Sequence, residues 1–179
     1  MNKLLKTYNF TDFKITKGNG SYLYTSKNKK LLDFSAGVAV NSLGYNHPVI
    51  KKSLQDQLKT GISHLSGSQV HEFKIKLSEL LSRESNKGDV FFSNSGAESI
   101  EAAIKIARNY GSHLKKYEII AMTSSFHGRT IGALSVGSNK NYKSHIGPIP
   151  GKVKFCKFNN SKHLKKLISK RTVAIIIEF

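Results

Sequence analysis

Two short segments combine residue types that can bind an anion or a planar cofactor. The first is Asn94-Ser95-Gly96-Ala97-Glu98, which joins an expected strand to an expected helix. A glycine allows close backbone approach, and a helix N-terminus offers unpaired N–H groups and the positive end of the helix dipole. A phosphate suits that environment, with the Ser95 hydroxyl as an additional donor. Ser95 and Glu98 also form an S-x-x-E capping box, which stabilises a helix start without any ligand, so the local sequence leaves both interpretations open.

The second segment is Phe126-His127-Gly128-Arg129-Thr130, which follows another expected strand. The Phe126 ring could stack on a planar cofactor, and Arg129 could hold a carboxylate through two parallel hydrogen bonds. Taken singly, a phenylalanine is more often a core residue and an arginine more often part of a surface ion pair. His127 has no metal-ligand partner at a useful spacing, because neither H-E-x-x-H nor C-x-x-C occurs, and we expect no metal site.

Other catalytic patterns do not fit the sequence. Residues 147–153 carry glycines and a lysine, but their spacing is not that of a P-loop and the final Ser or Thr is missing. No Ser-His-Asp arrangement is singled out by spacing. The chemistry therefore depends on the two segments above.

Alternation of strand and helix patterns from residue 89 onward predicts an α/β fold, a mostly parallel sheet with helices on its faces. The expected strands are 90–92, 118–123, 153–156 and a fully buried 173–177, and the expected helices are 97–111 and 161–170. Functional groups of open α/β sheets gather beyond the carboxyl ends of the strands. We therefore expect a chain that ends directly after a strand to be an incomplete domain.

Before residue 89 the pattern predicts short extended pieces, at 22–24 and 31–34, and two amphipathic helices. The first helix should follow Pro48 and end at Gly61, and the second should cover 69–82. We expect the apolar stripes of both helices to be core contacts that carry no chemistry. The stripes consist of Ile50, Leu54 and Leu58 in the first helix and of Val70, Phe73, Leu77, Leu80 and Leu81 in the second.

The composition is strongly basic, with 29 Lys and Arg against 11 Asp and Glu and a net charge of +18. Such a charge could attract nucleic acid, acidic membranes or acidic substrates. The lysines lack interleaved aromatics and no nucleic-acid motif accompanies them, which favours a solvated lysine-rich surface. The longest clean apolar run, 173–177, is too short to span a membrane, and no signal peptide is evident. A lone Cys156 is consistent with a cytoplasmic protein.

Three segments in order resemble the class-III aminotransferases, the ornithine/4-aminobutyrate group of pyridoxal-phosphate enzymes. They are Leu43-Gly44-Tyr45-Asn46-His47-Pro48, Phe92-Ser93-Asn94-Ser95-Gly96-Ala97-Glu98 and Phe126-His127-Gly128-Arg129-Thr130. Within the group, residues 33–41 and 135–137 are most similar to the acetylornithine type. The resemblance runs from about Gly18 to Glu178, nearly the whole chain.

The resemblance implies the N-terminal part of a fold-type I transferase that uses pyridoxal 5′-phosphate. Residues 1–60 would belong to the small domain, and 61–179 would form the first half of the large cofactor-binding domain. Ser95, Gly96 and Ala97 would bind the cofactor phosphate, and Phe126 would pack against the pyridine ring. Arg129 would bind the α-carboxylate of an amino-acid substrate.

The same resemblance limits what these residues can do. Chemistry in the family requires a lysine that forms a Schiff base and an aspartate that pairs with the pyridinium nitrogen, both later in the chain. We therefore assign no catalytic residue and expect these 179 residues to be an inactive fragment. Glu178 would fall beside the cofactor pocket, with Phe179 where the family has a proline. The role of His127 is support or packing.

The implied parent enzyme exchanges an amino group between acetylornithine and 2-oxoglutarate in arginine biosynthesis, as a homodimer. A 4-aminobutyrate or ornithine aminotransferase is an alternative, because these enzymes share the carboxylate-binding arginine. Two readings from other classes also stay open. The chain could be a basic nucleic-acid-binding module with inherited motifs, or a degenerate interaction module that associates with a complete homologue.

Overall fold

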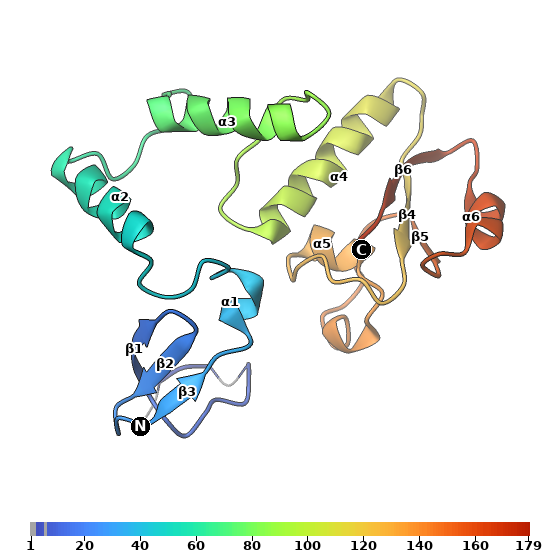
Figure 1. Ribbon diagram of the computed structural model, residues 1–179. Helices are drawn as coiled ribbons and strands as arrows, with labels where there is room; N and C mark the ends of the chain where they lie inside the picture. Colours follow the sequence, from blue (N-terminus) through green and yellow to red (C-terminus); the bar gives the residue numbers. More distant parts are fainter. Residues whose placement is uncertain (1–2, 6) are drawn as a thin grey trace. The chain divides into compact units, whose positions relative to one another are not determined.

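The computed structural model describes residues 3–5 and 7–179, which divide into a unit ending at Lys76 and a second unit, Leu77–Phe179 (Figure 1). The first unit contains an antiparallel sheet in the order β1-β2-β3, formed by β1 (Ile15–Asn19), β2 (Tyr22–Thr25) and β3 (Lys30–Leu32). Helices α1 (Ala36–Ala39) and α2 (Pro48–Lys59) follow, and α3 (Glu72–Glu84) continues into the second unit. The expected extended pieces and both amphipathic helices are therefore present.

The apolar stripes of α2 and α3 are not core contacts, so that prediction was wrong. Neither helix buries any residue, and Leu54 and Leu58 are 61% and 75% exposed. The periodicity correctly predicts helices, because it reports which residues share a face. Burial also needs a covering surface, and no element of the described residues covers these faces closely enough to supply it.

The second unit is built on a parallel sheet of three strands in the order β5-β4-β6. Its strands are β4 (Glu118–Met122), β5 (Val153–Cys156) and β6 (Thr172–Ile176), and its helices are α4 (Gly96–Ser112), α5 (Ile131–Val136) and α6 (Ser161–Leu167), with a short 3-10 helix η1 (Lys140–Tyr142). Strand β4 lies in the middle and is buried along its whole length. The predicted sheet, with these three strands, is confirmed.

Alternate residues of β4 face two different helical layers, as a strand's period of two requires. Ile119 and Ala121 cluster with Ile104 of α4 and Val136 of α5. On the other face, Ile120 and Met122 cluster with the buried Cys156, and α6 packs against them. Figure 1 shows α4 and α6 on opposite sides of the sheet. The core thus holds β4 rigidly, and its carboxyl end leads into the second candidate segment.

Three details of the predicted elements were wrong. Residues 90–92 are not a strand, because no strand of the described residues pairs with them, and Phe91 is 69% exposed. Strand β6 is only partly buried, with Ile175 39% exposed, because it lies at the edge of the sheet and β4 takes the centre. Helix α6 ends at Leu167, where a turn follows in which the Ser169 N–H donates to Thr172 Oγ1 at 2.9 Å.

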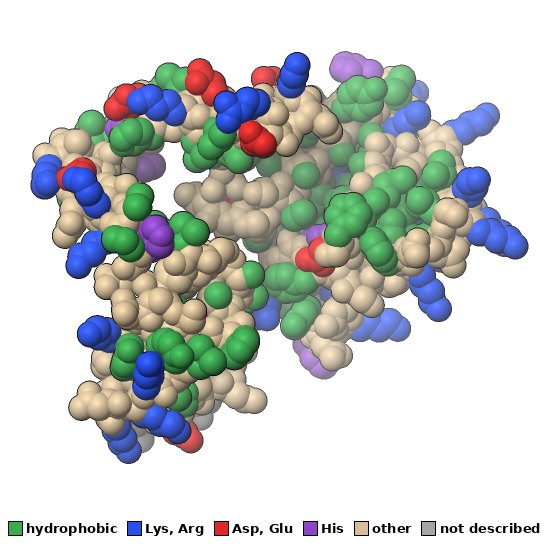
Figure 2. Space-filling model, in the orientation of Figure 1, with side chains coloured by type: hydrophobic (Ala, Val, Ile, Leu, Met, Phe, Trp, Pro, Cys, Tyr) green, Lys and Arg blue, Asp and Glu red, His purple; other side chains and the backbone are tan. Residues whose placement is uncertain are grey.

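The surface charge is spread out on the face shown in Figure 2, where Lys and Arg side chains of the second unit point outward into solvent. Within the described residues, no helix is long and apolar enough to cross a membrane. Those residues also contain no group of three His, Cys, Asp or Glu side chains that could hold a metal ion.

Candidate functional site

The first turn of α4 is capped as the sequence predicts. Ser95 has extended backbone angles (φ −153°, ψ 160°), and its Oγ accepts the Glu98 N–H at 3.2 Å. The Glu98 carboxylate reaches back and accepts the Asn94 N–H at 2.6 Å. This reciprocal pair satisfies two of the donors that a helix start leaves open, and it fixes where the helix begins.

The capped helix start also fits a phosphate group. Among the described residues, no acceptor bonds the backbone N–H groups of Gly96 and Ala97. A Cβ atom built on Gly96 meets nothing within 4 Å, so the space on that side of the residue is open. Two free N–H groups and the positive end of a 17-residue helix suit a phosphate, and the Ser95 hydroxyl proton is a third donor. Capping and phosphate binding are therefore compatible here.

Gly128 brings the second segment against this helix start. Its φ is +118°, a conformation that side chains with a Cβ rarely adopt. A Cβ at that position would lie 2.6 Å from the Cβ of Ala97 and 3.2 Å from the Cβ of Ala133. Only glycine permits so close an approach, so the backbone of the loop lies directly on the first turn of α4. The structure thus places the two candidate segments side by side.

A carboxylate from α4 joins the end of the loop to α5. Glu101 Oε1 accepts the Thr130 hydroxyl at 2.6 Å, the Gly132 N–H at 2.9 Å and the Ala133 N–H at 3.3 Å. These hydrogen bonds, that of Thr130 above all, lower the pKa of Glu101 below its ordinary value. The sequence did not single out Glu101, because a glutamate on a helix is usually a solvated surface residue.

Phe126 and Arg129 both contact Tyr142. Phe126 is 53% exposed and meets Tyr142 edge to face, with ring centroids 6.1 Å apart. The guanidinium carbon of Arg129 lies 4.9 Å from the centroid of the same Tyr142 ring, a cation–π distance. Phe126 is therefore not a core residue, and much of its ring can meet a ligand. Tyr142 carried no signal in the sequence, since a single tyrosine in a connecting segment has no characteristic pattern.

Glu178 and His127 flank Phe126. Glu178 Oε2 accepts the Phe126 N–H at 2.7 Å, which places Glu178 beside the loop. His127 is only 7% exposed, and its Nε2 has no hydrogen-bond partner among the described residues. Burial lowers the pKa of His127, and the nearby charge of Glu178 partly opposes that shift. Burial therefore favours the neutral form of the imidazole.

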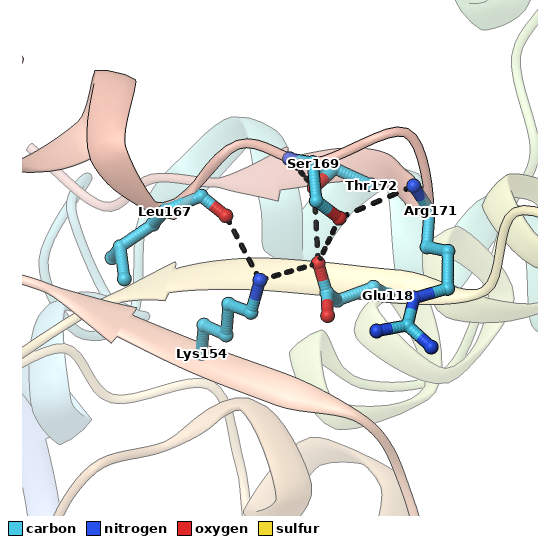
Figure 3. A network of polar contacts seen from close by, with 6 residues as sticks. All are labelled: Glu118, Lys154, Leu167, Ser169, Arg171 and Thr172. Carbon is cyan, nitrogen blue, oxygen red and sulfur yellow. Dashed lines mark hydrogen bonds and ion pairs between the residues drawn. The ribbon is translucent and has the colours of Figure 1, made fainter.

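A second polar cluster lies at the opposite end of the sheet, where β4 begins (Figure 3). Glu118 Oε1 accepts Lys154 Nζ at 2.8 Å, Ser169 Oγ at 2.7 Å and Thr172 Oγ1 at 3.2 Å. These contacts, first of all with Lys154, lower the pKa of Glu118 to about 2. Lys154 Nζ also donates to the Leu167 carbonyl at 3.0 Å. Because its groups bond one another, this cluster ties three strands together.

The arrangement is the α/β fold of the fold-type I enzymes. The structure is similar to an ornithine aminotransferase from Toxoplasma gondii, with a TM-score of 0.90 at 22% identity over 98% of this chain and 42% of the other. It is also similar to a pyridoxal-phosphate-bound amine transaminase from an uncultivated Pseudomonas species, with a TM-score of 0.87 at 19% identity over 98% and 48%.

Residues 6–178 match the class-III aminotransferase model, and the chain belongs to that family, whose members use pyridoxal phosphate. It is 43% identical to an acetylornithine/succinyldiaminopimelate aminotransferase of Buchnera aphidicola, over 99% of this chain and 45% of the relative. It is 41% identical to an acetylornithine aminotransferase of Clostridium acetobutylicum, over 98% and 46%. The chain thus spans less than half the length of these relatives.

Proposed function

We propose that this chain forms part of an acetylornithine-type aminotransferase that exchanges an amino group with 2-oxoglutarate in arginine biosynthesis. The relatives described above, both named for acetylornithine or succinyldiaminopimelate, support this choice. The observation that carries the proposal is the packing of Gly128 against Ala97, which puts an anion-binding helix start beside a loop with an exposed ring and a guanidinium. Such a pair of subsites fits a phosphorylated planar cofactor and an amino-acid substrate.

The residues of the site have separate tasks in this proposal. Ser95, Gly96 and Ala97 bind the phosphate through hydroxyl and backbone donors. Phe126 covers one face of the cofactor ring, and Arg129 holds the substrate carboxylate through a bidentate pair, so the reacting carbon is oriented. When bound, pyridoxal phosphate supplies an electron sink for negative charge that develops at the substrate carbon. The neutral, buried His127 supports the loop from below.

Substrate choice and catalytic competence belong to the same proposal. Succinylornithine transaminases of Yersinia are 35% identical to this chain, so acylated ornithines are the substrates we favour over 4-aminobutyrate or free ornithine. No lysine of this sequence matches the family's Schiff-base lysine, which comes later in the family's chain. We therefore propose that the 179 residues do not transaminate by themselves. A homodimeric, cytoplasmic parent enzyme remains an expectation from the resemblance.

The phosphate subsite is tested by placing a negative charge in it. Gly96→Asp suits the helix start, because an acidic side chain favours the first turn and the Cβ meets open space. At an exposed site the repulsion between carboxylate and phosphate should weaken pyridoxamine 5′-phosphate binding at least about tenfold. Ala103→Asp, an exposed position on the same helix, is the matched control and should leave binding unchanged. Equal affinities for all three proteins would refute the subsite.

The activity is tested by following glutamate formation from 2-oxoglutarate with acetylornithine, succinylornithine or 4-aminobutyrate as donor. The 179-residue chain should give no turnover. A full-length aminotransferase that contains this chain should prefer the acylated ornithines. Turnover by the 179 residues, or a preference for 4-aminobutyrate, would contradict the corresponding part of the proposal.

A further inference from the structure

The loop that carries Phe126 and Arg129 has little structure of its own. Residues 125–128 belong to no helix or strand, although the loop starts from a rigid, fully buried strand. Fixing the backbone of such a segment costs about 1–2 kcal/mol for each residue in conformational entropy. Contacts from outside the loop must offset that cost if two side chains are to keep one orientation.

Two glutamates from distant parts of the chain hold the loop at its two ends. At one end, Glu178 Oε2 accepts the Phe126 N–H at 2.7 Å. At the other end, Glu101 Oε1 accepts the Thr130 hydroxyl at 2.6 Å and the Gly132 N–H at 2.9 Å. All three hydrogen bonds are charge-assisted, and such bonds are about twice as strong as neutral ones. Phe126 is thus anchored directly, and Arg129 lies next to the anchored Thr130.

We infer that Glu101 and Glu178 are positioning residues, which fix the Phe126–Thr130 loop so that the Phe126 ring and the Arg129 guanidinium face the ligand. The inference rests on the proposed function for the identity of that ligand. Neither glutamate is given a role in the chemistry. Each acts through the backbone or the hydroxyl group of the loop.

Neighbouring side chains of the loop differ in burial, and the hydrogen bond from the Phe126 N–H to Glu178 fixes which of them faces solvent. Phe126 is 53% exposed, whereas the next residue, His127, is 7% exposed. The two neighbouring side chains therefore face solvent and the protein interior respectively, and a rotation of this segment would exchange the two rings. A fixed Phe126 N–H sets the rotation and keeps the phenyl ring outward and the imidazole inward.

The position of Glu178 separates this role from a role in the sheet. Strand β6 ends at Ile176, the last residue of its pairing with β4, so Glu178 lies beyond the ladder. Removing its carboxylate breaks a bond to the loop and no bond of the sheet. On α4, Ile104 is buried in the core, whereas the Glu101 side chain bonds to the loop and to α5.

The first test uses two ligands, pyridoxamine 5′-phosphate and inorganic phosphate, with the 179-residue chain. Glu101→Ala and Glu178→Ala should each weaken pyridoxamine 5′-phosphate binding at least about tenfold, as expected for the loss of one or more charge-assisted bonds, and leave inorganic phosphate binding unchanged. Glu→Gln at either position keeps an acceptor oxygen and should recover part of the loss. Glu84→Ala, on the exposed surface of α3, is the control.

The outcomes separate this inference from the proposed function. Unchanged pyridoxamine 5′-phosphate affinity in both alanine variants overturns the inference and leaves the proposed function standing. Equal losses of affinity for both ligands also overturn it. Such a result would indicate a general loss of structure, because only pyridoxamine 5′-phosphate has a ring that the loop could contact. If the unsubstituted chain binds neither ligand, the phosphate subsite of the proposed function fails and this inference fails with it.

A second test needs no ligand. Trypsin cleaves after Arg129 only when the loop opens, so the cleavage rate at that bond reports how firmly the loop is held. Glu101→Ala and Glu178→Ala should raise this rate about tenfold relative to cleavage after Lys87, which lies outside the sheet and its helices. A rate ratio equal to that of the unsubstituted chain would overturn the inference, whatever the ligands do.

Discussion

Replacing Glu118 with glutamine should destabilise the protein strongly at neutral pH. The Glu118 side chain is 8% exposed and accepts three side-chain donors, and its pKa falls from an ordinary 4.5 to about 2. At about 1.4 kcal/mol for each factor of ten in the ionisation constant, this shift corresponds to about 3–4 kcal/mol. Because Lys154 is 35% exposed and water reaches it, a loss of about 2–3 kcal/mol is expected for Glu118→Gln.

The sign of the pH dependence follows from the lowered pKa. A carboxyl group that ionises more readily when folded stabilises the protein above its unfolded pKa, near 4.5, and the stabilisation is lost as the pH falls toward 2. Glutamine does not titrate. The difference in unfolding free energy between Glu118 and Glu118→Gln should therefore be full at pH 7 and shrink between about pH 4.5 and pH 2.

Urea denaturation of the 179-residue chain, followed by circular dichroism at pH 7 and pH 3, measures both effects. Glu84→Gln is the matched control in the same unit, because Glu84 is 68% exposed and pairs with Arg83 at the surface. The control should lose less than about 0.5 kcal/mol. A loss for Glu118→Gln as small as the control's, or a loss that is the same at pH 3, would refute the reasoning.

Three further substitutions test local geometry by the same denaturation assay. Gly128→Ala should cost about 2–3 kcal/mol, because a Cβ at φ +118° would lie 2.6 Å from Ala97, and a loss below about 0.5 kcal/mol would contradict this packing. Gly111→Ala should destabilise by about 1–3 kcal/mol despite alanine's higher helix propensity, since its Cβ would lie 2.1 Å from the Lys116 carbonyl oxygen; a gain in stability would show that the contact relaxes. Ser95→Ala should cost about 1 kcal/mol through the lost cap, and no change would show that the cap is redundant.

The elements of the second unit could be predicted because local patterns determine them. The continuous apolar run 119–122 and the helical spacing of Ile100 and Ile104 both mark residues that the core buries, and β4 and α4 follow them. The start of α4 was also predictable, because Ser95 and Glu98 have the fixed spacing of a capping box. The Ser95 hydroxyl accepts the Glu98 N–H, and the Glu98 carboxylate accepts the Asn94 N–H. The roles of Ser95, Gly96, Ala97, Phe126 and Arg129 remain predictions, now with a common location.

The errors and omissions concern contacts between segments that are distant in the sequence. Residues 90–92 have a strand composition, but a strand also needs a neighbour to bond with, and composition says nothing of neighbours. Glu101 and Tyr142 meet the loop only after the chain has folded back, so their spacing carries no signal. Glu118 looked like an ordinary start of a strand, although three donors converge on it, from β5, from the turn before β6 and from the first residue of β6.

Strand β4 has a carboxylate network at its start and the candidate site beyond its end, with an apolar core between them. Substitutions at the two poles should therefore combine additively, since distant sites with no shared partners rarely couple. Substitutions near Lys154 should therefore change the free energy of unfolding and leave the ligand affinities of the candidate site unchanged. The same independence holds for natural sequence variation. Changes at the start of β4 can alter thermal stability, and changes beyond its end can alter substrate preference.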